Sequence, residues 1–229
     1  MKLNSLLSSL ALGGILAISS IPANAITITQ DNLDTAFTVN WQLLSGQMDN
    51  NGGTPTPIDL TATGGFHIAG FDANSLLLDV MMTNTTVVPS GVNAGITSFG
   101  FGVSPNATSV LFMDSVDGAF TSAVVQTGQQ NYPGGYKNID VCVFTAGCNG
   151  GSQVGALAAG ASDSFQLQIF GDFSGGSVML DPFVIKFQTS YGSFEFSGST
   201  PPSTSVPEPA TLALLGLGLV GVGFTRRNK

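Results

Sequence analysis

The residues with the clearest chemical potential in this chain are two cysteines six positions apart, Cys142 and Cys148, in the stretch IDVCVFTAGCNGGS. In an exported chain such a pair predicts a disulfide, because the compartments outside the cytoplasm are oxidising. A closed zinc site takes four ligands, and the single histidine, His67, is far away in the sequence. Free buried thiols and a reactive cysteine are the alternatives. Cys142 falls on the face opposite Val141 and Val143, so we expect the bond to lie away from that core row, with Gly147 free to take a positive φ.

Catalytic constellations are harder to find. A nucleophile needs a general base within reach, and His67 lies in a strand-like stretch, GGFHIAGF, where a structural or surface role is more common. No G-x-S-x-G, H-E-x-x-H, P-loop or dinucleotide fingerprint occurs. Carboxylate pairs for glycoside hydrolysis are available, but Trp41, the one tryptophan, falls in a core-facing row rather than a sugar cleft. The sequence therefore predicts no catalytic residue, no cofactor and no enzyme.

Two candidate binding features remain. Tyr132 and Tyr136, in NYPGGY, are predicted on an exposed turn, where their rings could stack on sugar faces; the alternative is that they cover a sheet edge. The stretches 31–34 and 114–118 place aspartates near turns, where calcium can collect oxygen ligands. Neither stretch has the ligand density of an EF-hand loop, so we expect aspartate-capped turns and no metal site.

Charge narrows the range of partners. Residues 26–205 hold thirteen acidic residues against Lys137 and Lys186, a net charge of −11. Such a surface repels nucleic acid phosphates and anionic lipid, so we expect neither as a partner. A negatively charged surface favours solubility, and it is compatible with divalent cations or a neutral polysaccharide as partners.

Apolar and polar residues alternate with the period of a β-strand through most of the body. Stretches rich in Asn, Gly and Pro separate nine or ten such segments, and only 154–161 could be helical. This pattern predicts an all-β ectodomain, an antiparallel β-sandwich or jelly-roll-like fold. The segments with this pattern are 37–43, 99–103, 139–143, 165–169, 183–187 and 194–196, with 75–82 apolar on both faces as a central strand.

The N-terminus has the layout of a cleavable signal peptide over residues 1–25. Lys2 gives a positive start, residues 6–18 are apolar, and Ala23 and Ala25 form an A-x-A cleavage signal. A buried N-terminal helix is the alternative, which the small residues before Ile26 disfavour. We expect signal peptidase to release a chain that begins near Ile26.

The C-terminus ends in an uncharged segment of fifteen residues, 210–224, followed by Arg226, Arg227 and Lys229. As a helix this segment spans about 22 Å, against a hydrocarbon core of ~30 Å, so it is a marginal anchor. The positive-inside rule keeps the basic residues cytoplasmic, which places the body across the membrane. Residues 198–205, rich in Ser, Thr and Pro, read as a spacer between body and tail.

The motif Val206-Pro207-Glu208-Pro209, the apolar helix and the basic end at 206–229 together resemble the PEP-CTERM sorting signal of Gram-negative bacteria. The resemblance implies cleavage near the motif by an exosortase, an integral-membrane protease, and release to the cell surface or extracellular matrix. An ordinary tail anchor is the alternative. The ectodomain is expected to span residues 26–197. The stretch from 139 to about 198, at its C-terminal end, also resembles a cyanobacterial PEP-CTERM subgroup, the cistern family, which implies no particular activity.

These observations predict an exported, exosortase-sorted surface or matrix protein with a structural or interaction role and no catalysis. The alternative is a carbohydrate-binding module that docks on exopolysaccharide, with Tyr132 and Tyr136 as its sugar contacts. Expected partners are the exosortase during processing, then exopolysaccharide or other matrix proteins. Contact with the inner membrane is expected to be transient, through the C-terminal helix.

Overall fold

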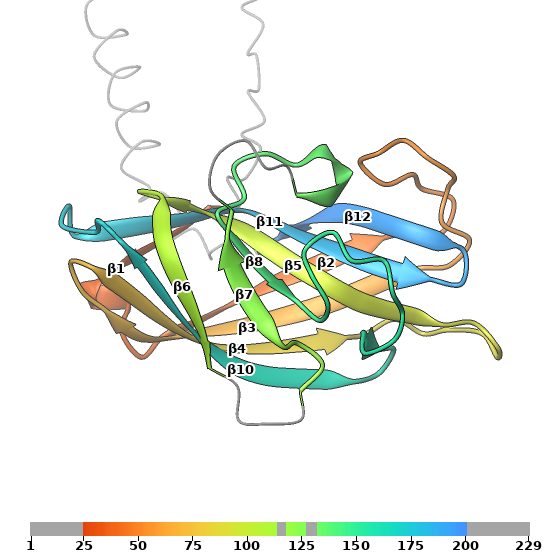
Figure 1. Cartoon of the computed structure of the whole chain (residues 1–229), viewed down its shortest axis with the longest axis horizontal. Helices are drawn as coiled ribbons and strands as arrows, with labels where there is room; N and C mark the ends of the chain where they lie inside the picture. The colour runs from red at the N-terminus through yellow and green to blue at the C-terminus, as the bar shows by residue number, and fades with distance from the viewer. Residues whose placement is uncertain (1–24, 114–117, 127–131, 201–229) are drawn as a thin grey trace, which may run out of the picture.

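The structure, a computed structural model, describes residues 25–113, 118–126 and 132–200 (Figure 1). The predicted all-β class is confirmed: the described residues form strands and two single-turn 3₁₀ segments, η1 (Gln30–Asn32) and η2 (Pro133–Gly135), and no α-helix. The stretch 154–161 is not helical but contains the two-residue strand β9. No helix in the described ranges is long and apolar enough to span a membrane.

The strands are β1 (Ile26–Thr29), β2 (Ala36–Leu43), β3 (Leu60–Phe71), β4 (Ser75–Asn84), β5 (Ala94–Ser104), β6 (Ala107–Met113), β7 (Ser122–Val125), β8 (Val141–Phe144), β9 (Leu157–Ala158), β10 (Ser162–Gly171), β11 (Ser177–Thr189) and β12 (Gly192–Ser199).

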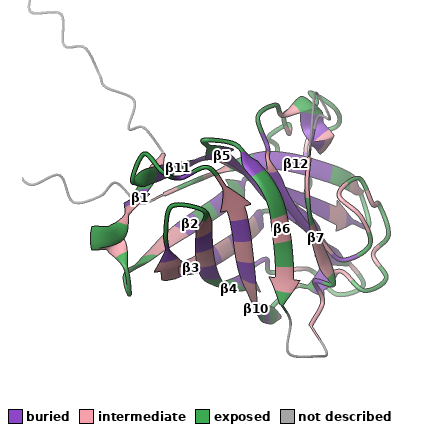
Figure 2. Ribbon diagram, turned by 60° about the vertical axis from the view of Figure 1, so that its left-hand side comes forward, coloured by how far each residue is buried: buried purple, intermediate pink, exposed green. Residues whose placement is uncertain are grey.

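All strand pairs are antiparallel and form one continuous sheet in the order β6-β10-β4-β3-β2-β12-β11-β5-β8-β7, with β1 added to β11 and β9 to β5. The two ends of this order, β6 and β7, lie side by side, so the sheet is a nearly closed barrel (Figure 2). The sequence predicts an antiparallel sandwich or jelly-roll-like fold, and the structure shows an antiparallel sheet that is nearly closed on itself. Strand β12 is the physical reason: 192–197 pair with β11, while 198–199 pair with β2, so one strand joins both halves.

The core fills the interior of this barrel, where the inward rows of the strands meet. The predicted inward row of β2 is confirmed, with Val39 and Trp41 fully buried. Phe66 of β3 lies at the centre of an aromatic group, 5.0 Å from Phe37 and 5.6 Å from Phe183 between ring centroids. Because Phe66 points inward, its neighbours on β3 must point outward. This alternation sets up the outer surface described below.

A second, smaller cluster packs on the outside of β8, β5 and β11. It contains Tyr132, Ile139, Cys142 and Val184, partly covered by Cys148. The predicted disulfide is confirmed: Cys142 and Cys148 are bonded, with Cα atoms 6.1 Å apart. Its location is also as predicted, because Val141 and Val143 belong to the main core and Cys142 does not. Gly147 has φ +117°. Ile139 was expected in the row of Val141 but lies in the outer cluster, because β8 begins only at Val141.

One ion pair is buried on this same outer face. Lys186 of β11 and Glu195 of β12 are direct cross-strand partners, with Nζ 2.6 Å from Oε1 and side chains only 8% and 3% exposed. The Glu195 carboxylate also accepts hydrogen bonds from Asn51 Nδ2 (2.8 Å) and Ser193 Oγ (3.0 Å). Its backbone N–H donates to Asp49 Oδ2. Glu195 thus holds β11, β12 and the loop that follows β2 together.

Lys186→Met tests this interaction. Methionine keeps an apolar stem but leaves the Glu195 charge buried without its cation, which costs about 3–5 kcal/mol of unfolding free energy. Urea unfolding measures the loss from the midpoint and the slope. His67→Ala is the control, because it breaks an exposed pair with Asp79 and should cost less than about 1 kcal/mol. An effect of Lys186→Met as small as that of the control would contradict this role.

Replacing both Cys142 and Cys148 by alanine tests the disulfide. The bond closes a loop across a sequence separation of 6, and loop entropy gives a loss of about 2 kcal/mol when it is removed. The barrel should stay folded, because the bond lies outside the main core. The expected result is a lower urea midpoint with an unchanged near-ultraviolet circular dichroism spectrum. A double variant that loses that spectrum in buffer would show that the bond is needed for the fold itself.

Candidate functional site

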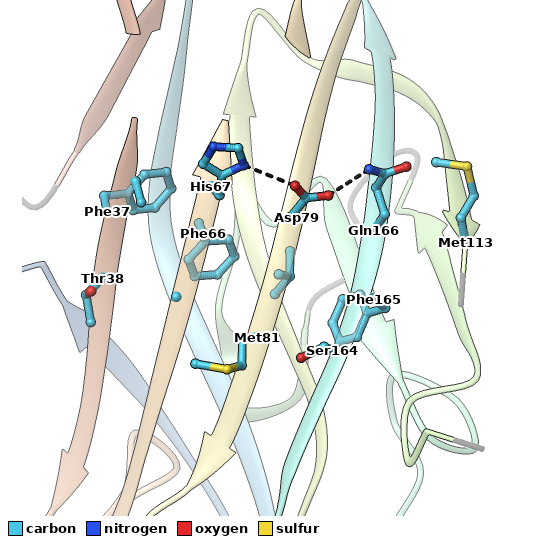
Figure 3. A pocket seen from close by; sticks show the side chains of 13 residues that line it. Phe37, Thr38, Phe66, His67, Asp79, Met81, Met113, Ser164, Phe165 and Gln166 are labelled. Atoms are coloured by element: carbon cyan, nitrogen blue, oxygen red, sulfur yellow. Dashed lines mark hydrogen bonds and ion pairs between the residues drawn. The ribbon is translucent and has the colours of Figure 1, made fainter. Parts of the chain in front are cut away.

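A groove of about 690 Å³ crosses the outer face of β2, β3, β4 and β10 (Figure 3). We call it the outer-face groove. Strand register explains its composition, since residues paired on neighbouring strands point to the same side of a sheet. Two cross-strand rows form it. The first row is Ala36, His67, Asp79, Gln166 and Met113, and the second is Thr38, Gly65, Met81 and Ser164.

The first row carries a hydrogen-bonded polar group contributed by three strands. His67 Nδ1 lies 3.0 Å from Asp79 Oδ2, and Gln166 Nε2 donates to Asp79 Oδ1 at 2.7 Å (Figure 3). The hydrogen bonds from Gln166 and then His67 lower the pKa of the Asp79 carboxyl. Asp79 is therefore ionised at neutral pH, and it accepts the imidazole N–H because a carboxylate can only accept.

This arrangement leaves hydrogen-bond acceptors facing the groove. With Nδ1–H donating to Asp79, Nε2 of the His67 imidazole is the ring nitrogen left to accept a hydrogen bond. Gln166 donates one amide N–H to Asp79, which leaves its second N–H as a donor and its carbonyl oxygen as an acceptor. Neither Nε2 of His67 nor Oε1 of Gln166 has a protein partner among the described residues. The polar row thus offers one charged and two neutral acceptors to a ligand.

The hollow of the groove comes from the second row. At Gly65 an added Cβ would meet nothing closer than the Met81 carbonyl oxygen at 4.0 Å, so the floor there is open. The apolar walls are the thioether side chains of Met81, 54% exposed, and Met113, 38% exposed. Methionine side chains adapt their shape to the surface that they contact. The groove therefore combines a flat, open floor with adaptable walls and a fixed polar row.

The His67–Asp79 pair resembles half of a catalytic triad, but the other half is not assembled. The two hydroxyls that line the groove belong to Thr38 and Ser164, and neither is hydrogen-bonded to His67 among the described contacts. Both stand in the second row, away from the imidazole (Figure 3). Within the described ranges no group of three or more His, Cys, Asp or Glu residues could hold a metal ion.

The partners of His67 were not predicted from the sequence. A regular hairpin closed by Phe71 and Leu76 would pair His67 with Val80, and it is the register shift between Ile68 and Gly70 that brings His67 opposite Asp79. No local pattern in the sequence predicts the contact between Gln166 and Asp79, because β10 and β4 become neighbours only in the folded sheet.

The predicted sugar contact at Tyr132 is wrong in its premise. Tyr132 is 0% exposed, and its hydroxyl hydrogen-bonds with Ser98 Oγ at 2.9 Å. Burial raises the pKa of the Tyr132 phenol far above its usual range. Tyr136 is half-buried beside it, and its pKa is also raised by burial. The two residues pack on the outer face of the sheet, beside Cys142 and Val184, rather than on an exposed turn or over a sheet edge.

Several predicted features lie outside the described residues. These are the signal peptide up to Asn24, including Ala23, the sorting motif Val206, Pro207, Glu208 and Pro209, the apolar segment 210–224, the basic residues Arg226, Arg227 and Lys229, and Asp114 and Asp117. Ala25 is the first described residue and directly precedes β1. Of the other candidate calcium ligands, Asp31 lies in η1, and Asp34 has φ +60° in the turn that follows.

Comparison with known proteins identifies the C-terminal end of the chain. The family model described as PEP-CTERM protein-sorting motif matches residues 205–227. The comparisons with curated proteins and with solved structures found no match. The chain thus carries a PEP-CTERM protein-sorting motif, which implies an exported, cell-surface-sorted protein that is processed by an exosortase.

Proposed function

We propose that this is a surface or extracellular-matrix protein that acts by binding rather than by catalysis. The observation that carries the proposal is the sorting motif at residues 205–227, which implies delivery to the cell surface. The body supports a binding role because its outer-face groove presents fixed acceptors without an assembled nucleophile. Membership of the cistern family is part of the same proposal, on the resemblance of residues 139–198.

The ends of the described chain and the outer-face groove are on different strands, which allows binding while the chain is still attached to the membrane. Strands β1 and β12 both pair with the same edge of β11, opposite the edge that pairs with β5. The described chain therefore begins and ends along one edge of one strand. The outer-face groove lies on other strands, β2, β3, β4 and β10. A ligand could occupy the groove before and after release from the membrane.

The second candidate function is a carbohydrate-binding module that docks on exopolysaccharide. The outer-face groove, rather than the tyrosine pair, now supports it. Carbohydrate sites place a few polar groups beside an apolar surface, and the row of His67, Asp79 and Gln166 lies beside Met81 in this way. A protein partner in the matrix is the remaining option within the same binding role.

The sorting step is tested by intact mass measurement of the protein from strains with and without the exosortase. With the enzyme present, the secreted form should lack residues 210–229, because cleavage near the motif removes them. Without it, the full tail should remain and the protein should stay with the inner membrane. Replacing Pro207 and Glu208 by alanine should have the same effect as loss of the enzyme. A secreted form that keeps residues 210–229 in the presence of the enzyme would disprove the proposal.

A further inference from the structure

We propose that the outer-face groove binds a protonated amino-sugar polymer, with the Asp79 carboxylate as the acceptor of its ammonium group. This inference rests on the carbohydrate-binding candidate above and names its ligand class. It depends on four properties of the groove: the sign of its charge, the kind of hydrogen-bonding groups that it presents, the strand pairing of the backbone beneath it, and its open floor.

Among the described residues, Asp79 is the one acidic residue that lines the groove, and the imidazole of His67 is the one basic group beside it. Asp79 is ionised, and none of the lining residues is Lys or Arg. In residues 26–205 the only basic side chains besides His67 are Lys137 and Lys186. Lys186 is already paired with Glu195, buried on the far half of the sheet. With a net charge of −11 over this body, the field at the groove attracts cations and repels anionic polysaccharides.

The polar row of the groove presents mainly acceptors. The acceptors are the Asp79 carboxylate, Nε2 of His67 and the side-chain carbonyl of Gln166. The donors of the groove are the second N–H of Gln166 and the hydroxyls of Thr38 and Ser164. The complement of the polar row is a ligand rich in donors. An ammonium group brings three donors and a positive charge, and sugar hydroxyls supply further donors. A bond from an ammonium to a carboxylate is charge-assisted and stronger than one between neutral groups.

The backbone of β3, β4 and β10 beneath the groove is paired on both sides within the sheet. Strand β4 pairs with β3 on one side and β10 on the other, and β10 pairs with β4 and β6. A peptide that binds by strand addition needs a free edge, which these strands do not offer. Recognition over these strands must use side chains alone. A sugar that carries its own hydroxyls and amine meets this requirement better than an extended peptide does.

The floor and walls suit a flat ring. Gly65 leaves open space above the sheet, and Ala36 and Ser164 in the same rows are small. Met81 and Met113 can cover the apolar faces of the rings. Neighbouring strands lie about 4.8 Å apart, so a polymer that runs across β3, β4 and β10 meets one polar side chain at each strand. Asp79 on β4 is in the middle of this row.

The test is calorimetric titration of the secreted, processed protein with three probes: chitosan oligosaccharides, fully acetylated chitin oligosaccharides of the same length, and polylysine. At a mildly acidic pH, where the chitosan amines are protonated and Asp79 is still ionised, the wild-type protein should bind the chitosan probe at least about tenfold more tightly than the acetylated one, since a charge-assisted bond is roughly that much stronger than a neutral one.

Three variants locate the interaction. Asp79→Asn keeps the shape and one acceptor but removes the charge, so it should remove the preference for chitosan. Asp172→Asn removes an acidic group of a turn outside the groove and should change nothing. Gly65→Val fills the floor with a side chain that strands favour, and should abolish binding of both sugars without lowering stability.

Each contrary outcome is distinct. Equal losses with Asp79→Asn and Asp172→Asn would mean attraction to the acidic surface in general and would overturn the site. Tighter binding of the acetylated probe would overturn the amino-sugar inference and leave the carbohydrate-binding function standing. Asp79-dependent binding of polylysine alone would identify a cationic protein partner and overturn both. None of these outcomes affects the sorting proposal, because its readout is the mass of the exported chain.

Discussion

The barrel depends on one strand more than on any other. Strand β12 is hydrogen-bonded to β11 along most of its length and to β2 at its end, so it is the element that makes one sheet out of two halves. A buried ion pair lies in the middle of this strand. Burying two charges is unfavourable unless each is paired and its remaining capacity is satisfied. Glu195 meets this condition through Lys186, Asn51 and Ser193, so the position of β12 is tied to β11 and to the loop after β2.

Two adjacent glycines show how strand alternation separates structure from function. At Gly64 an added Cβ would lie 2.9 Å from atoms of Trp41, Phe66 and Met82, so the core requires a glycine there. Gly65 points the other way and has open space above it. The inward glycine allows close packing of the aromatic core, and the outward one leaves the hollow that forms the groove floor. A single residue step along β3 divides these two roles.

The sequence predicted the parts of this structure that depend on local pattern. The pattern of apolar residues identified segments of β2, β4, β5, β8, β10, β11 and β12 and the inward position of Trp41, and two cysteines six positions apart identified the disulfide. The sequence did not predict the closure of the sheet, because β12 pairs with β2 through residues far apart in the sequence, such as Trp41 and Gly198. The groove was missed for the same reason, since Gln166 meets Asp79 only in the folded sheet. Tyr132 was misplaced because a Pro-Gly-Gly turn normally indicates exposure, whereas here the turn folds back onto the sheet.

The place of β12 at the end of the described chain has a consequence for export. A polypeptide that crosses a membrane from its N-terminus delivers residues 192–199 after every other strand. Until residues 192–199 arrive, β2 and β11 each have an unpaired edge, and Lys186 lacks its partner carboxylate, Glu195. Unpaired strand edges invite association with other chains. The domain therefore becomes protected from aggregation only when translocation has brought the last strand across, immediately before the sorting signal at 205–227. Completion of the fold and presentation of the cleavage signal are thus successive events at the same end of the molecule.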